Sequence, residues 1–368
     1  MVAAIAQITQ PIGKKASGSI KEAVIDCDIH TAPASSKTLL KYLPQRWRRH
    51  HETIGSRGHV GSAYPRANPN AARHDAWPPN GGPPGSDLAF LQMQLLDGWN
   101  IEYGIMNPLM GAGGQTNLEY GAALSQALND WQIEEWVEKE PRLRASIIIP
   151  YEDADLSVAE IERCAQHPGF VQILLIVRTK EPLGRRKYHK IYEVAERHNL
   201  PIGIHFGGAG GGPITGAGWP SHYYEDHCGM PQAFQAQVAS YALEGVFERF
   251  PGLKVVLIEG GFAWMPPLLW RLDKTWQRLG DEVPELKRPP SEYIRENIWI
   301  STQPMEEPNQ RHHFHQLLEQ LNMNDKLLFA TDYPHWDFDS PDRAIPVKLD
   351  KELERNIMAE NARNLYRF

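Results

Sequence analysis

Residues 24–30 read VIDCDIH, and this stretch sets the pattern for the rest of the chain. It begins with apolar residues suited to a buried strand and then places Asp26, Asp28 and His30 at every second position. Because successive side chains of a strand point to opposite faces, these three side chains share one face. The stretch therefore predicts a buried strand that carries polar side chains toward its carboxyl end.

Similar short apolar runs recur along the chain. Most are continuous rather than alternating, which indicates strands that are covered on both faces, as in a parallel sheet. The strand candidates are 23–29, 101–107, 144–150, 171–177, 201–206, 254–260, 297–302 and 326–332.

Segments with helical patterns fall between these runs, at 121–140, 157–166, 187–199, 233–250, 313–322 and 350–366. The second of them opens with Ser157 and has Glu160 three residues later, a capping-box pattern. Eight strands that alternate with helices predict one α/β domain, a (β/α)8 TIM barrel over residues 23–368. A doubly wound open sheet is the alternative. The count of eight and the lack of a GxGxxG turn after the first strand favour the barrel.

Two long segments rich in glycine and proline interrupt the alternation, at 55–86 after the first strand and 207–231 after the fifth. They are expected to be loops. Long loops in a compact domain are usually functional, and both follow the carboxyl end of a strand, where barrel active sites lie. Residues 1–22 are expected to form a tail that is flexible or packs on a neighbouring subunit.

Composition excludes several classes of function. A net charge of −7 argues against nucleic acid or an anionic membrane as the main partner, since both select basic surfaces. No apolar run reaches the roughly 18 residues needed to span a membrane. The start of the chain lacks the features of a secretory signal, and three scattered cysteines do not make a disulfide framework. A cytoplasmic location is therefore expected.

Two further polar residues end apolar runs, namely His205 in the fifth strand and Asp332 in the eighth. A barrel brings all strand ends to one rim, so these side chains are expected to meet Asp28 and His30. Two carboxylates and two imidazoles suit one divalent metal ion, Zn²⁺ or Mn²⁺, with Fe²⁺ as a further option. Such an ion would activate water or polarise an oxygen of a small-molecule substrate.

Several motifs together resemble the amidohydrolase superfamily. They are DxH on the first strand, IHFGG at 204–208, the long stretch VFERFPGLKVVLIEGGFAWMPPLLWRLD at 246–273, and LLFATDYPHWD at 327–337. The resemblance is to the amidohydrolase-related branch, which includes aminocarboxymuconate-semialdehyde decarboxylase, γ-resorcylate decarboxylase and several hydrolases. It implies a metal-dependent barrel enzyme in which Asp28, His30, His205 and Asp332 bind one metal.

The chain departs from the pattern of that superfamily at three places. Asp28 stands where many members have histidine, and it resembles the ExH of some decarboxylases. Glu259 stands at the end of the sixth strand, where many decarboxylases of the family carry a histidine that acts on the substrate. The fourth strand ends near Arg178 rather than in the lysine that bridges two metals in binuclear members, which favours a mononuclear site.

Roles for other residues remain alternatives at this point. Glu259 is either a general base or a carboxylate that orients a ligand histidine, unless it forms a simple salt bridge. His335 contacts substrate or caps a loop, and Arg178 binds a substrate carboxylate or forms a structural ion pair. Trp219 and Trp264 are candidates for the wall of an aromatic pocket, with core packing the alternative for Trp264.

The first functional hypothesis is a metal-dependent hydrolase of a small organic substrate, carboxylic or aromatic. In it Asp332 moves the proton and Glu259 assists. The second keeps the metal and removes CO₂ from an aromatic or dienoic acid without oxidation. The third is a catalytically silent barrel that serves as a scaffold. A homodimer or larger homo-oligomer is also expected.

Overall fold

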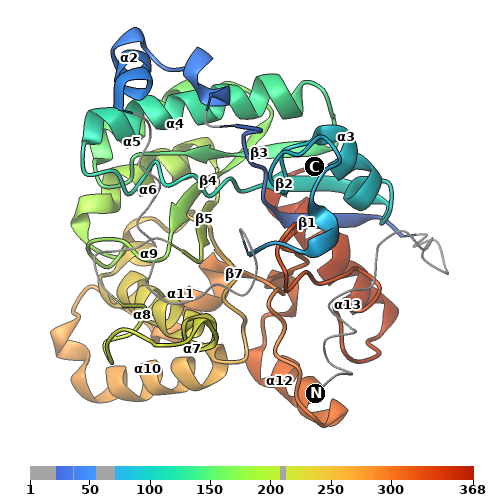
Figure 1. Cartoon of the computed structure of the whole chain (residues 1–368). Helices are drawn as coiled ribbons and strands as arrows, with labels where there is room; N and C mark the ends of the chain where they lie inside the picture. Colours follow the sequence, from blue (N-terminus) through green and yellow to red (C-terminus); the bar gives the residue numbers. More distant parts are fainter. Residues whose placement is uncertain (1–21, 36, 55–70, 208–212) are drawn as a thin grey trace.

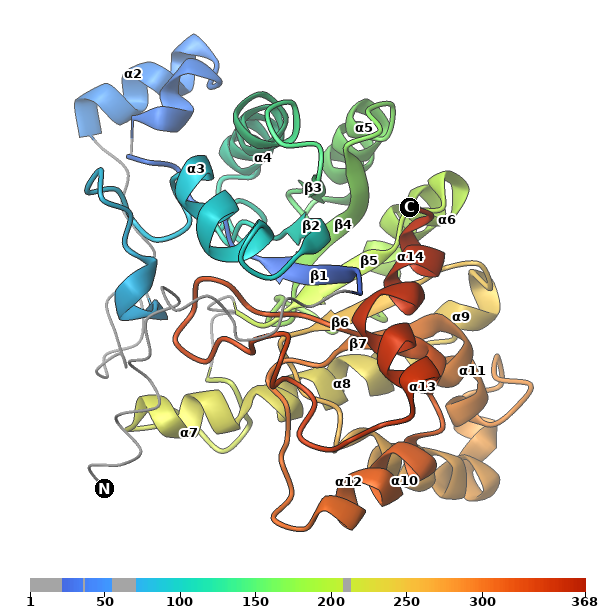
Figure 2. The same cartoon turned by 90° about the vertical axis from the view of Figure 1, so that its right-hand side faces the viewer.

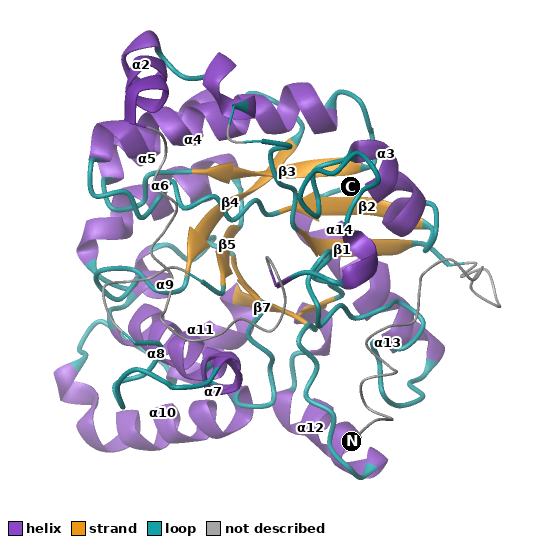
Figure 3. Cartoon of the chain, viewed as in Figure 1, coloured by secondary structure: helices purple, strands orange, loops and turns teal. Residues whose placement is uncertain are grey.

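The computed structural model describes residues 22–35, 37–54, 71–207 and 213–368. Within these ranges one eight-stranded parallel sheet runs in chain order from β1 to β8, with helices around it (Figure 1; Figure 3). The strands are β1 Val24–Ile29, β2 Ile101–Met106, β3 Leu143–Ile148, β4 Phe170–Ile176, β5 Ile202–His205, β6 Val255–Ile258, β7 Ile298–Ser301 and β8 Leu327–Leu328.

Helices follow the strands and form the outer layer of the barrel. The α-helices of the described residues are α2 Gln45–Ile54, α3 Leu88–Leu91, α4 Leu118–Gln132, α5 Ala154–Cys164, α6 His189–His198, α7 Tyr223–Cys228, α8 Met230–Leu243, α9 Val246–Arg249, α10 Met265–Leu279, α11 Pro290–Asn297, α12 Arg311–Leu321, α13 Lys351–Arg355 and α14 Asn361–Tyr366. Short 3₁₀ or π segments are η1 Thr38–Lys41, η3 His74–Ala76, η4 Gln92–Leu96, η5 Ile133–Val137, η6 Arg186–Tyr188, η7 Gly280–Glu282, η8 Asn324–Lys326 and η9 Asn356–Glu360. In both views α2 projects beyond the ring (Figure 1; Figure 2).

This architecture confirms the predicted (β/α)8 barrel. Each of the eight strand candidates overlaps a strand, but β8 covers only Leu327–Leu328 of the candidate 326–332. The helix predicted from Ser157 begins earlier, because Asp153 rather than Ser157 is its N-cap and accepts a hydrogen bond of 3.0 Å from the amide of Leu156. The helix predicted over 233–250 is two helices, α8 and α9. They are separated at Gly245, whose φ of 67° lies in the left-handed region.

The seam between β1 and β8 closes with few ladder bonds. β8 contains only Leu327 and Leu328, which pair with β7, and a single parallel bridge between Ile29 and Tyr333 is described across the seam. Across the seam the amide of Cys27 donates to the carbonyl of Phe329 at 3.0 Å. The carboxylate of Asp26 accepts from the amide and the hydroxyl of Thr331 at 2.9 and 2.6 Å. Asp26 therefore supplies side-chain acceptors where a regular strand would use backbone carbonyls, and this holds the middle of β1 against the segment after β8.

A chain of polar side chains crosses the interior of the barrel. Asn107 accepts hydrogen bonds from Ser146 and Gln172 at 2.7 and 2.9 Å, and Gln172 accepts one from Tyr366 at 2.9 Å. All of these groups are buried and each is paired, as buried polar atoms must be. The chain reaches the carboxyl end of β1, because Asn107 also donates to Asp28 at 2.9 Å.

The predicted loops are only partly loops. Of 55–86, residues 55–70 lie outside the described part, and 71–86 contain η3. Of 207–231, residues 208–212 lie outside it, and the rest contains α7 and the start of α8. The tail prediction for residues 1–22 falls almost wholly outside the described residues. Among the helices described, none has the length and apolar character that crossing a membrane requires.

Candidate metal centre

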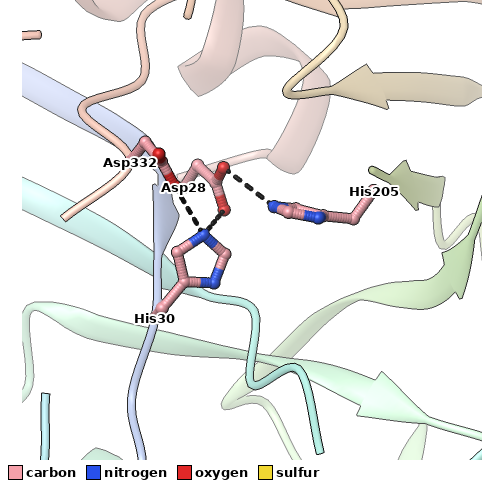
Figure 4. Close-up of side chains that lie close together, drawn as sticks. All are labelled: Asp28, His30, His205 and Asp332. Atoms are coloured by element: carbon pink, nitrogen blue, oxygen red, sulfur yellow. Dashed lines mark hydrogen bonds and ion pairs between the residues drawn. The ribbon is translucent and has the colours of Figure 1, made fainter. Parts of the chain in front are cut away.

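Polar side chains from three strand ends meet at one mouth of the barrel (Figure 4). Asp28 lies in β1 and His30 follows it, His205 ends β5, and Asp332 comes after β8. Nε2 of His30 lies 2.8 Å from Oδ1 of Asp332 and 3.3 Å from Oδ1 of Asp28, and Nε2 of His205 lies 3.2 Å from Oδ2 of Asp28. One donor atom from each residue lies within 4.8 Å of the others, so the four can surround one ion.

Backbone carbonyls orient both imidazoles. Nδ1 of His30 lies 2.7 Å from the carbonyl oxygen of Asn107, and Nδ1 of His205 lies 2.5 Å from that of Phe206. A carbonyl oxygen only accepts, so each Nδ1 carries the proton and donates it. In a neutral ring the lone pair is then on Nε2, which faces the carboxylates. This is the arrangement by which metal-binding histidines are fixed in one tautomer.

Charges in this group balance one another although all four side chains are buried. Burial would raise the pKa of Asp28, but the imidazoles of His30 and His205 lower that pKa well below its usual range. Burial would lower the pKa of His30, but Asp28 and Asp332 raise it well above its usual value. Negative oxygens thus stabilise positive charge between them, and a cation can replace the protons there.

This donor set fits one divalent metal ion. Two carboxylates and two imidazoles, each imidazole with an inward Nε2, are ligands that Zn²⁺, Mn²⁺ and Fe²⁺ accept. Four protein ligands also leave room for substrate or water. The group therefore agrees with the predicted mononuclear centre in its residue types and in its convergence.

Glu259 lies beside this group. It directly follows β6, and its Oε2 is 3.2 Å from Nε2 of His205. Both Glu259 and Asp332 have φ of 60°, a left-handed conformation that is strained for residues with a side chain. Burial, and then repulsion from Asp332 and Asp337, raise the pKa of Glu259 well above its usual value. The predicted catalytic carboxylates are therefore adjacent but differ electrostatically.

His335 lies over the metal group. Its Nδ1 is 2.6 Å from Oδ1 of Asp332, and its ring stacks on that of His30 at 4.4 Å between centroids. About one fifth of its side chain is exposed, at 19%. His335 therefore supports a proposed ligand, a role that was not predicted, and its predicted contact with substrate stays a prediction.

The other predicted substrate contacts lie further out or in the packing. Trp264 is half-buried, and its indole donates to the carbonyls of Gly260 and Gly261 at 2.8 and 3.1 Å. It stabilises the turn after Glu259. Arg178 lies two residues beyond β4 and is partly exposed. Trp219 is 64% exposed in the segment after β5, and it stays a prediction as a substrate contact.

The whole barrel matches a family model described as amidohydrolase, over residues 25–368. The chain belongs to this family. Among curated relatives, γ-resorcylate decarboxylase of Rhodococcus jostii is 27% identical over 271 residues, which cover 67% of this chain and 78% of the relative.

Solved structures agree with the fold of this amidohydrolase. An amidohydrolase from Mycobacterium avium subsp. paratuberculosis superposes with a TM-score of 0.70 at 22% identity, covering 94% of this chain and 100% of that one. A 5-carboxyvanillate decarboxylase from Novosphingobium aromaticivorans, with bound manganese, gives 0.71 at 17% identity, covering 96% and 99%. This amidohydrolase is accordingly a metal-dependent hydrolase or decarboxylase, as the resemblance implied, and not a silent scaffold.

Four residues that support the centre of this amidohydrolase were not predicted. Asn107 and Gln303 hydrogen-bond directly to Asp28 and Asp332. Asn107 ends the apolar run of β2, so the rule that identified His205 also points to it, whereas Gln303 follows Ser301 and Thr302 beyond the apolar run of β7. Asp337 and His227 hydrogen-bond to each other at 2.9 Å and have no such signal, because Asp337 lies in the loop after β8 and His227 in the short helix α7.

Proposed function

We propose that this amidohydrolase removes CO₂ from an aromatic or dienoic carboxylic acid without oxidation, with one divalent metal bound by Asp28, His30, His205 and Asp332. The observation that carries the proposal is the similarity to γ-resorcylate decarboxylase along two thirds of the chain, together with the donor group at the barrel mouth. The acidic residue at position 28 supports it. Hydrolysis, the first hypothesis from the sequence, becomes the second candidate.

The reaction breaks the bond between a ring carbon and the carboxylate carbon and forms a C–H bond in its place. The electron pair of the broken bond stays on the ring carbon and is taken up by a proton. The bound metal would supply a Lewis acid that holds carboxylate or neighbouring hydroxyl oxygens. The chain must therefore supply an acid close to the donor group but separate from it.

Glu259 is better placed for that role than Asp332. Oδ1 of Asp332 is within hydrogen-bond distance of His30 and His335, and its Oδ2 accepts from Gln303. These contacts leave Asp332 to bind the metal. The sequence-based hypothesis gave Asp332 the proton transfer. We assign it to Glu259 instead, because its Oε2, at 3.2 Å from Nε2 of His205, adjoins the four proposed metal ligands without being one of them.

Substrate binding is proposed at the predicted contacts around the mouth. His335 is close enough to the donor group to touch an aromatic ring placed there. Arg178 would bind a second anionic group, and Trp219 and Trp264 would border the ring. A substitution of Arg178 by lysine would raise KM more than it lowers kcat, because lysine cannot form the bidentate contact.

One experiment separates the two candidate reactions. The protein is loaded with Mn²⁺ or Zn²⁺ and incubated with 2,6-dihydroxybenzoate and 5-carboxyvanillate, and in parallel with their methyl esters. Headspace CO₂ and the free acids are measured. CO₂ from the acids with the esters intact supports decarboxylation. Ester cleavage without CO₂ would overturn it.

Glu259 is also the observation that favours hydrolysis. A carboxylate beside metal-bound water can act as general base, a role that differs from acid catalysis only in the starting position of the proton. The ester arm of the experiment therefore tests the same residue in its other role. The predicted homodimer or larger assembly is tested by light scattering on the same preparation.

A further inference from the structure

The loop after β8 connects the metal centre to several distant segments. The amide of Trp336 donates to the carbonyl of Ala71 at 2.8 Å, and its indole donates to the hydroxyl of Tyr223 in α7 at 3.0 Å. In Figure 2, α7 and the loop after β8 lie on the same side of the barrel. This loop follows Leu328 and contains Asp332, so α7 is held against the segment that carries a proposed metal ligand.

A second set of hydrogen bonds links Asp332 to α7 through side chains. Nε2 of Gln303 donates to Oδ2 of Asp332 at 3.2 Å and to Oδ2 of Asp337 at 3.1 Å. The same Oδ2 of Asp337 lies 2.9 Å from Nε2 of His227, the next-to-last residue of α7. Gln303 is fully buried, and the side chains of Asp337 and His227 are 12% and 17% exposed. Three contacts thus lead from Asp332 to α7.

We propose that Gln303 and Asp337 are positioning residues that couple the Asp332 carboxylate to the docking of α7. The hydrogen bond from Gln303 to Oδ2 fixes the plane of the Asp332 carboxylate, because turning the carboxylate out of that plane would break this bond and move Oδ1 away from the metal group. Gln303 holds that oxygen, and Asp337 and His227 hold Gln303. The inference rests on the proposed metal group and adds to it a route by which the loop after β5 affects metal binding.

Coupling of this kind works in both directions. If docking of α7 favours the metal-binding orientation of Asp332, then a bound metal must favour docking of α7 by the same factor. A purely structural chain of hydrogen bonds would change stability without this reciprocity. Hydrogen exchange in α7 with and without metal is therefore a readout that does not depend on catalysis.

The test measures Mn²⁺ affinity and hydrogen exchange of Tyr223–Cys228 in the wild-type protein and in Gln303→Met, Asp337→Asn and His227→Gln. His315→Gln is the control, because this exposed histidine lies in α12 and outside the path to α7. Gln303→Met should weaken Mn²⁺ binding by about tenfold to a hundredfold, the range for groups that orient ligands. Mn²⁺ should slow exchange in α7 of the wild type and the control, but less in His227→Gln.

Each possible outcome is informative. If Gln303→Met keeps its Mn²⁺ affinity, the coupling is wrong but the metal group stands. The same follows if the wild type binds Mn²⁺ and hydrogen exchange in α7 does not change. A wild type that binds no Mn²⁺ overturns the metal group itself. If Gln303→Met does not fold, as judged by circular dichroism, His227→Gln at the outer end of the path carries the test.

Discussion

Asp26 and Asp28 lie two residues apart on β1, both without solvent exposure, yet they belong to regions of opposite character. At the seam, Asp26 accepts hydrogen bonds from Thr331, and burial raises its pKa from 3.8 to about 7. At the mouth, Asp28 faces two imidazoles and its pKa is lowered. A buried carboxylate alone therefore does not form a cation site. Asp28 differs from Asp26 because the imidazoles of His30 and His205 lie beside it and lower its pKa.

The largest expected effect, on metal content and activity, comes from replacing His205 at the mouth. His205→Ala removes one of two imidazole ligands, and we expect bound metal to be lost on dialysis and activity to fall at least about a thousandfold, since metal assistance is worth several kcal/mol. Metal analysis by mass spectrometry and an activity assay check this. His198→Ala is the control, because that histidine pairs with Glu162 on the outer layer. If His205→Ala keeps its full metal content, His205 is not a metal ligand.

Glu259→Gln tests whether catalysis and metal binding at the mouth depend on different carboxyl groups, because Glu259 lies beside the four proposed ligands and is not one of them. Metal content should stay at the wild-type level while kcat falls by about 10² to 10⁴, the usual contribution of general acid–base catalysis. Exposed Glu285, replaced by Gln, is the matched control. A loss of metal in Glu259→Gln, with no separate loss of kcat, would instead make Glu259 a metal ligand.

Asn107 connects the mouth to the polar chain in the barrel interior. Asn107→Leu removes the hydrogen bond to Asp28 but keeps the backbone carbonyl that orients His30, so metal affinity should fall by about tenfold. Ser146→Ala is the control, because it removes a hydrogen bond to Asn107 and leaves Asp28 with its partner. If both variants lose affinity equally in a Mn²⁺ titration, the effect comes from the interior and not from the ligand.

The sequence predicted the barrel and the meeting of the four donors because both depend on strand ends. An apolar run that stops at a polar residue is visible without a structure, and the barrel topology then places His205 and Asp332 at one rim. The contacts of Asp337 and His227 were not predictable, because they depend on how two loops meet. The length of β8 was not predictable either, since the apolar run continues through Phe329 and Ala330 beyond the last paired residue, Leu328.

The last prediction concerns thermal stability rather than metal binding, and it tests the seam. Asp26 has a folded-state pKa of about 7 against an unfolded value near 3.8, so its proton favours the folded state. Its contribution to stability is complete below about pH 4 and is lost as the pH rises through about 7, by at most about 4 kcal/mol. Asp26→Asn keeps two polar atoms for Thr331 and has no charge to bury.

Metal-free Asp26→Asn should therefore gain in Tm relative to the wild type between about pH 5 and about pH 8, by a few degrees. The wild type at each pH is the reference, which cancels every other titrating group. An equal Tm difference at both pH values would mean that Asp26 is ionised in the fold. The donors of Thr331 and the amide of Asp28, which lies 3.2 Å away, would then outweigh burial as the imidazoles do for Asp28. The contrast between the seam and the mouth would in that case be one of hydrogen-bond donors rather than of charge.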